Sequence, residues 1–191
     1  MQDSITTQPI TPPSAQAVLE FWFQQHGAQD WFGKDPAFDH AIRTQFLATY
    51  QQAITGELMD WRSTAQGRLA EIIVLDQFAR NLFRGQPQQF AGDSVALVLA
   101  QEAIAQGADQ LLTPEYRVFM YMPYMHSESR WIHQQALQLF TALGIAHNLD
   151  FEIKHKVIID RFGRYPHRNA ILGRESSAEE LDFLQQPNSR F

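Results

Sequence analysis

The chain has no cysteine, and only three of its 191 residues are lysine. The lack of cysteine excludes disulfides, thiolate zinc sites and cysteine nucleophiles. A net charge of −6 with so few lysines gives no basic surface for following a phosphate backbone, so we expect no binding to nucleic acid. The positive charge is carried mainly by twelve arginines, and their grouping is the main clue to function.

Long hydrophobic runs are also absent. The longest strongly apolar run, residues 72–75, is far shorter than the roughly 20 residues that a membrane span needs. The first ten residues have neither the basic nor the apolar region of a signal peptide. We therefore expect a soluble cytoplasmic protein that does not bind membranes. Three prolines predict a flexible arm at residues 1–13, followed by a single all-α domain at residues 14–191.

Turn and capping residues divide this domain into helices, and no run alternates apolar and polar residues as a strand does. Ser14, Asp35 and Asp93 are typical helix N-caps, and Pro123 should end the fifth helix. Short loops favour antiparallel helical hairpins, in a tetratricopeptide-like bundle or short solenoid. About eight helices are predicted, beginning near residues 14, 35, 64, 93, 113, 127, 148 and 177.

The predicted third helix has a polar face near its C-terminal end, within an arc of about 140°. This face contains no lysine or glutamate, the usual residues of a solvated face. Arginine forks and side-chain amides suit the recognition of planar or tetrahedral anions. A solvated face with one Asp76–Arg80 pair is the alternative interpretation. The residues of the face are Asp76, Gln77, Arg80, Asn81 and Arg84.

A second polar segment, residues 161–175, concentrates arginines where Gly163, Pro166 and Gly173 should prevent a long helix. A loop of this composition is suited to holding a charged group. We interpret it as the second half of a site that begins on the third helix. Its candidate ligand-binding residues are Arg161, Arg164, Arg168, Asn169 and Arg174, and it also carries His167 and Glu175.

The histidines raise the question of a metal. A site made of His126, Glu128, His155 and His167 is conceivable, because imidazole and carboxylate together bind several divalent metals. No pair of histidines spaced for one helix face supports it, so we predict no metal and no other cofactor. His126 and His167 are expected either to make structural hydrogen bonds or to contact a ligand. Surface positions are predicted for His26, His40, His133 and His147.

Three segments together resemble a widespread bacterial family, the domain-of-unknown-function family numbered 924. They are Leu-Asp-Gln-Phe-Ala-Arg-Asn-Leu-Phe-Arg-Gly at residues 75–85, Tyr-Met-Pro with His-Ser-Glu at residues 121–128, and Arg-Phe-Gly-Arg-Tyr-Pro-His-Arg-Asn at residues 161–169. The resemblance covers nearly the whole chain and implies an all-α fold similar to the tetratricopeptide-like superfamily. It implies no established activity. Ala79 stands where the family usually has proline, which would kink the helix, so a straighter helix is expected here.

These observations lead to three hypotheses. The first is a protein that binds a small anionic metabolite in an arginine-rich pocket, with or without catalysis. The second is a helical scaffold that binds a peptide or protein. The third is an internal ion-pair network that locks the last loop onto the third helix. Under the first hypothesis, the candidates for proton transfer are Asp76, His126, Glu128, His167 and Glu175. The sequence predicts no oligomeric state.

Overall fold

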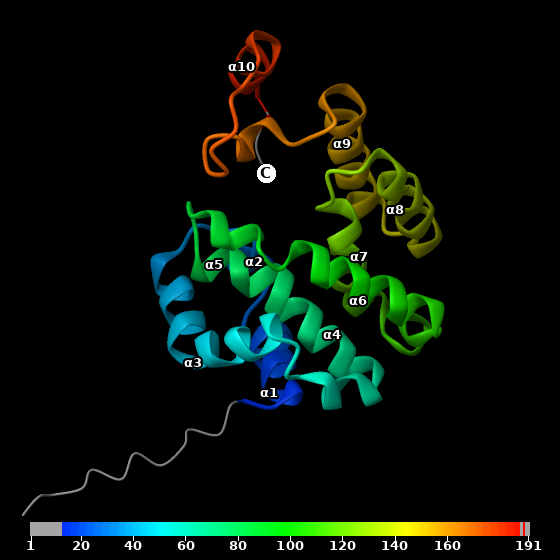
Figure 1. Cartoon of the computed structure of the whole chain (residues 1–191). Coiled ribbons are helices and arrows are strands. Elements are labelled where there is room, and N and C mark those ends of the chain that lie inside the picture. Colours follow the sequence, from blue (N-terminus) through cyan, green and yellow to red (C-terminus); the bar gives the residue numbers. More distant parts are fainter. Residues whose placement is uncertain (1–12, 188, 190–191) are drawn as a thin grey trace, which may run out of the picture.

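A computed structural model of the chain describes residues 13–187 and 189. These residues form helices joined by turns, and no strand occurs among them, so the predicted all-α fold is confirmed. Figure 1 shows the chain rising from α1 near the base to α10 at the top. Residues 1–12 of the predicted arm lie outside the described residues.

The N-terminal helices begin where the capping residues predict. Ser14 caps α1 (Ala15–Glu20), which runs into a π turn at Phe21–Gln25. Asp35 caps α3 (Pro36–Ile54), which begins with a proline. The N–H of the first helical position has no partner inside a helix, so the proline there loses no hydrogen bond. A further short helix, α2 (Ala28–Trp31), was not predicted.

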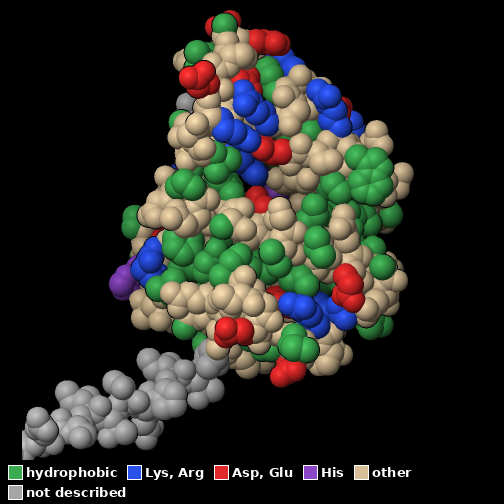
Figure 2. All heavy atoms as spheres, viewed as in Figure 1, with side chains coloured by type: hydrophobic (Ala, Val, Ile, Leu, Met, Phe, Trp, Pro, Cys, Tyr) green, Lys and Arg blue, Asp and Glu red, His purple; other side chains and the backbone are tan. Residues whose placement is uncertain are grey.

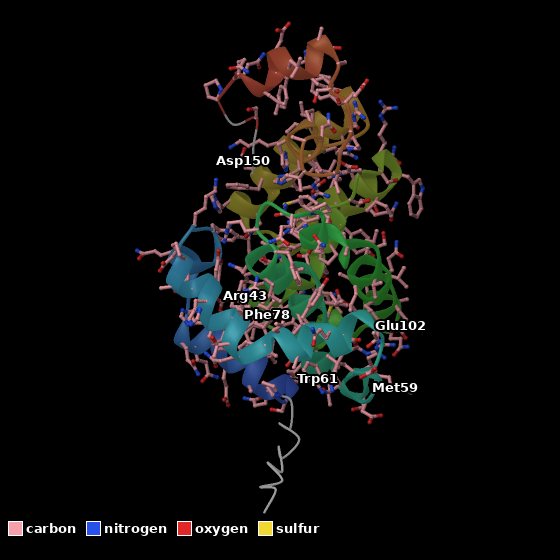
Figure 3. All side chains as sticks on the ribbon, turned by 60° about the vertical axis from the view of Figure 1, so that its left-hand side comes forward. Arg43, Met59, Trp61, Phe78, Glu102 and Asp150 are labelled. Carbon is pink, nitrogen blue, oxygen red and sulfur yellow. The ribbon has the colours of Figure 1, made fainter. Side chains whose placement is uncertain are left out.

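The predicted third helix forms the centre of the fold as one continuous helical run. It consists of α4 (Ala65–Ile73), a π turn (Val74–Phe78) and α5 (Ala79–Leu82), with Thr64 as the N-cap. Every residue from 69 to 79 is buried, including Phe78, which Figure 3 labels within the helical layer. Helix α4 packs against α1, α6 and α7, so the π turn lies in the middle of the molecule.

The remaining helices complete the fold above this centre. Helices α8 and α9 form a hairpin, and α7 packs against both of them. Helix α10 packs against the 3₁₀ turn Pro166–Arg168 in the arginine loop, and its Phe183 ring lies 5.1 Å from the Phe162 ring at the end of α9. The bounds are α6 (Asp93–Ala105), α7 (Pro114–Met125), α8 (Arg130–Leu143), α9 (Ala146–Phe162) and α10 (Ala178–Leu184).

Two details of the predicted helices are corrected. Pro123 lies inside α7, which continues to Met125. Pro123 lies within the last turn of α7, and only two residues of the helix follow it. Its missing N–H removes one backbone hydrogen bond, and the helix ends soon after it. The other correction concerns α6, whose N-cap is Gly92, so that Asp93 is the first helical residue.

No helix in the described part of the chain is long and apolar enough to cross a membrane.

Candidate functional site

Asp76 lies in the π turn of the central helix, and its carboxylate is completely buried. Its Oδ1 lies 2.7 Å from His126 Nδ1 and 3.1 Å from Arg80 Nη1. Its Oδ2 accepts a hydrogen bond of 2.5 Å from Gln77 Nε2. Burial raises the pKa of Asp76, but the Arg80 charge and the His126 contact outweigh it and hold this pKa below its usual range. Asp76 is therefore a buried, ionised carboxylate in a π turn, an irregularity that is frequent at functional sites.

His126 follows the last residue of α7 and is oriented by Asp76. Because an ionised carboxylate only accepts hydrogen bonds, His126 Nδ1 must carry a proton. Burial, followed by the nearby Arg80 charge, lowers the pKa of His126. The imidazole is therefore neutral at pH 7, and Nε2 holds a free lone pair. Nε2 makes no hydrogen bond to any described residue.

Two arginines converge on one carboxylate beside this histidine. Arg80 binds Asp93 through both terminal nitrogens, at 3.0 and 3.2 Å. Arg168, from the arginine loop, lies 3.2 Å from Asp93 Oδ2 and 3.1 Å from the main-chain oxygen of His126. We call the group of Asp76, Arg80, Asp93, His126 and Arg168 the Asp76 centre.

Arg168 is held in an aromatic sandwich. Its guanidinium carbon lies 4.5 Å from the ring centroid of Phe90 and 4.7 Å from that of Tyr165. The side chain is only 8% exposed, and burial lowers its pKa, although an arginine this basic stays charged. Its Nε is buried and has no hydrogen-bond partner within the described chain. Figure 2 shows acidic, basic and histidine side chains together in a recess between the upper and lower parts of the molecule.

The arginine loop is itself fastened by carboxylates. Arg174 binds Glu128 through two bonds, at 2.5 and 2.9 Å, and the same carboxylate accepts the main-chain N–H of Tyr165 at 2.7 Å. Arg164 binds Glu180 in the same bidentate way, at 2.6 and 2.8 Å. Glu128 is therefore part of an ion pair here, and it is not free to act as a base.

Asn169, Arg161 and Glu175 occupy three different settings in this loop. Asn169 is buried and links Arg174 to Ser176, through bonds of 3.0 Å each. Arg161 forms an exposed pair with Glu179. Glu175 is exposed, and its main-chain oxygen accepts a bond from Arg164.

Asn81 and Arg84 do not join the Asp76 centre. Both bind Asp39 of α3, Arg84 by two bonds of 2.7 Å and Asn81 by one of 2.8 Å. They line a separate cavity of about 290 Å³ together with Arg43 and His40. The structure thus divides the predicted polar face between two places. A solvated face is the wrong interpretation for its inner part, because Asp76, Gln77 and Asn81 are buried.

His133 was predicted at the surface and is completely buried. Its Nδ1 lies 2.8 Å from Glu152 Oε1, and its Nε2 lies 2.9 Å from the main-chain oxygen of Ser127 and 3.1 Å from Tyr165 Oη. Glu152 supplies the polar partner that makes burial of the imidazole tolerable. His40 and His147 are exposed, as predicted, and His26 is half-buried against Asp30.

His167 lies in the 3₁₀ turn of the loop, half-buried, with its ring 5.6 Å from that of Tyr165. His155 Nδ1 donates a hydrogen bond to the main-chain oxygen of Phe151, and burial lowers the pKa of His155 to about 3. The four residues considered for a metal therefore have other contacts. No group of three or more histidine, aspartate or glutamate side chains suited to a metal occurs in residues 13–187 and 189.

A larger, mainly apolar cavity of about 620 Å³ lies between α6, α7 and α8. Ile104, Tyr124, Trp131 and Leu139 line it, together with glutamine side chains, and Trp131 is 62% exposed. Neither this cavity nor the polar one contains a residue of the Asp76 centre. The Asp76 centre is therefore identified by its chemistry and its unused hydrogen-bonding atoms, and not by cavity size.

Residues 18–188 match the family described as bacterial protein of unknown function (DUF924). The chain belongs to this family. A solved structure of a protein of unknown function, ATU0120 from Agrobacterium tumefaciens, is similar to it at 40% identity with a TM-score of 0.86. The match covers 90% of this chain and 96% of that one. No protein with a curated description matches the chain.

For this DUF924 chain, sequence reasoning selected four residues of the Asp76 centre, namely Asp76, Arg80, His126 and Arg168. It missed Asp93, which it treated only as a helix cap. The sequence carried one weak signal for Asp93: this residue begins α6 soon after the Arg84-Gly85 end of the central helix. It also missed Glu152, whose partner His133 lies on a different helix.

Proposed function

We propose that the protein binds a small anionic metabolite at the Asp76 centre. The observation that carries this proposal is the free Nε2 of His126, on a neutral imidazole oriented by Asp76 and flanked by Arg80 and Arg168. A histidine held in this way by a carboxylate has one nitrogen reserved for a proton or a ligand atom. The unpartnered buried Nε of Arg168 adds a donor without an acceptor, which costs about 1–3 kcal/mol unless a bound molecule satisfies it.

The proposed roles follow from this geometry. Arg80 and Arg168 would bind the anionic group of the metabolite, because guanidinium forks match carboxylate and phosphate oxygens. His126 Nε2 would hold a proton beside the bound molecule, and Asp76 would stabilise the imidazolium. These are parts of general acid–base catalysis, and they are consistent with binding that is coupled to a proton.

The other predicted ligand-binding residues have a supporting role in this proposal. Arg164 and Arg174 bind carboxylates of the chain itself, and these pairs hold the loop that carries Arg168. They resemble the internal ion-pair network of the third hypothesis. The network and the site are thus compatible, because a rigid loop is what positions Arg168 in its aromatic sandwich.

A thermal-shift screen against carboxylated and phosphorylated metabolites tests the proposal. A ligand at a hundred times its dissociation constant adds about 2.7 kcal/mol, which raises the melting temperature of a domain of this size by roughly 5–10 °C. His126→Gln should lose this rise, and the exposed control Arg161→Gln should keep it. A flat response of the wild-type protein across a broad panel would contradict metabolite binding.

The apolar cavity favours a second candidate function, peptide binding. Its volume of about 620 Å³ is in the range of ligand pockets, and an exposed tryptophan at its edge is typical of a binding hot spot. A helical peptide would place its apolar face against Trp131, and its binding would shift the tryptophan fluorescence. Trp131→Ala should abolish binding without affecting the Asp76 centre.

A cytoplasmic location and the absence of nucleic-acid and membrane partners stay predictions.

A further inference from the structure

The formal charges of the Asp76 centre cancel. Arg80 and Arg168 contribute two positive charges, and Asp76 and Asp93 contribute two negative ones. His126 is neutral at pH 7 because burial and the Arg80 charge lower its pKa. An anion that entered this group would leave a net negative charge in a largely buried place, which is costly unless another charge changes.

We propose that the Asp76 centre binds its anion together with one proton, which His126 Nε2 takes up from solvent. The inference rests on the proposed function and adds to it a coupling between ligand and proton. The bond formed is N–H at Nε2, and no other covalent bond changes. The imidazolium then restores the charge balance of the site.

His126 is the group at this centre best able to change its charge near neutral pH. Asp76 and Arg80 face it from the central helix, Asp93 from α6, and Arg168 from the arginine loop. The arginines stay protonated, and the low pKa of Asp76 keeps that carboxylate ionised. From α9, His155 also interacts with His126, and burial holds its pKa at about 3, so it stays neutral. Asp76 is already hydrogen-bonded to Nδ1 and would stabilise a charge on the ring.

A competing arrangement would avoid the proton. Asp93 is 17% exposed and is the first residue of α6, and in this arrangement the anion would displace its carboxylate from Arg80 and Arg168. The two arginines would then exchange one anion for another. In that arrangement the affinity for the anion would not depend on the protonation of His126. The pH dependence of the affinity therefore distinguishes the two arrangements.

Inorganic sulfate is a suitable probe, because it binds arginine forks and does not titrate near neutral pH. Its dissociation constant should be measured by calorimetry from about pH 5.5 to about pH 8.5, a range that spans the ordinary histidine pKa. Uptake of one proton predicts that the dissociation constant rises about tenfold for each pH unit between the pKa of His126 in the free protein and its higher pKa in the sulfate complex. Imidazole NMR of the wild-type protein should show the pKa of His126 rising when sulfate is added.

His126→Asn provides the matched variant, because its amide can donate to Asp76 in place of Nδ1 but does not titrate. The variant should bind sulfate only weakly, with a dissociation constant that is independent of pH, and the exposed control His147→Asn should keep the wild-type slope. Sulfate binding to the wild-type protein without pH dependence, or with no change in the His126 pKa, overturns the inference and leaves the proposed site standing. If sulfate does not bind at any pH, both the inference and the site are wrong.

Discussion

Gly92 lies so close to the main-chain oxygen of Leu75 that a Cβ on Gly92 would be 2.6 Å from it. This contact joins the turn before α6 to the π turn of the central helix. The next residue along the chain, Asp93, binds Arg80 and Arg168. A close backbone approach that only glycine permits is therefore what places the shared carboxylate of the Asp76 centre.

Gly92→Ala should destabilise the protein by about 1–3 kcal/mol, because backbone atoms must move to admit the new methyl group. Urea denaturation followed by circular dichroism measures this. Gly27→Ala is the control, since a Cβ there meets nothing within 4 Å and its φ of −156° suits any residue. The control should change stability by less than about 0.5 kcal/mol. Equal effects of the two substitutions would contradict the close contact.

The helices were predictable because their signals are local. Ser14, Asp35 and Thr64 accept hydrogen bonds from the first turn of the helices that follow them, and Ser177 forms a capping box with Glu180. Each signal needs only a few neighbouring residues. The π turn at Val74–Phe78 had no such signal, since its sequence is an ordinary helical one.

The partners in the site were not predictable, because they come from distant parts of the chain. Asp93 meets Arg168 across 75 positions, and Glu128 meets Arg174 across 46. With 21 acidic residues available to 15 basic ones, composition does not select the pairs. The burial of His133 is a case of the same kind, because it depends on Glu152 from the neighbouring helix. The sequence indicated which residue types could form a site, and the fold decided which arginines lie together.

Arg168→Ala should destabilise the protein by about 1–3 kcal/mol, because Asp93 loses one of its two arginine partners and the main-chain oxygen of His126 loses a donor. It also removes the group that stacks between Phe90 and Tyr165. Arg161→Ala is the matched control from the same loop, because its pair with Glu179 is exposed. An exposed pair contributes less than about 1 kcal/mol. Denaturant titrations of both variants check this, and a loss below about 1 kcal/mol for Arg168→Ala would show that the network is not stabilising.

Glu152→Gln tests the buried His133–Glu152 pair through its pH dependence. Burial raises the pKa of Glu152 above its ordinary 4.5. The protonated folded form is therefore fully stable below about pH 4.5, and the wild-type protein should lose stability as the pH rises through the raised pKa. Glutamine resembles the protonated acid, so the variant should not show this loss.

The free energy of unfolding, measured at several pH values, gives the comparison. Glu57→Gln, at an exposed glutamate, is the control and should follow the wild-type curve. A loss of stability in Glu152→Gln that is constant at every pH would contradict this, because it would mean that His133 and Glu152 form an ion pair over the whole pH range.

Glu180→Gln should loosen α10 without affecting the helical core. The hydrogen bonds from Arg164 lower the pKa of Glu180 to about 2 despite its burial, and the main-chain N–H of Ser177 adds to the effect. A lowered carboxyl pKa means that the stabilisation is present above about pH 4.5 and is lost as the pH falls toward about 2. Hydrogen exchange of residues 178–184, corrected for intrinsic rates, should show protection falling in this window in the wild-type protein.

The variant should have less protection of α10 at neutral pH and no fall between these values, because glutamine keeps the capping bond but forms no ion pair. Glu179→Gln is the neighbouring control: its carboxylate pairs with Arg161 at the surface, at 63% exposure, so its removal should leave α10 as in wild type. Because Glu180 also accepts a bond from Asn169, loosening of α10 should extend to the loop that carries Arg168. Unchanged exchange in that loop would mean that the Arg164–Glu180 pair does not hold Arg168 in place, and the support proposed for the Asp76 centre would have to come from Glu128 and Arg174 alone.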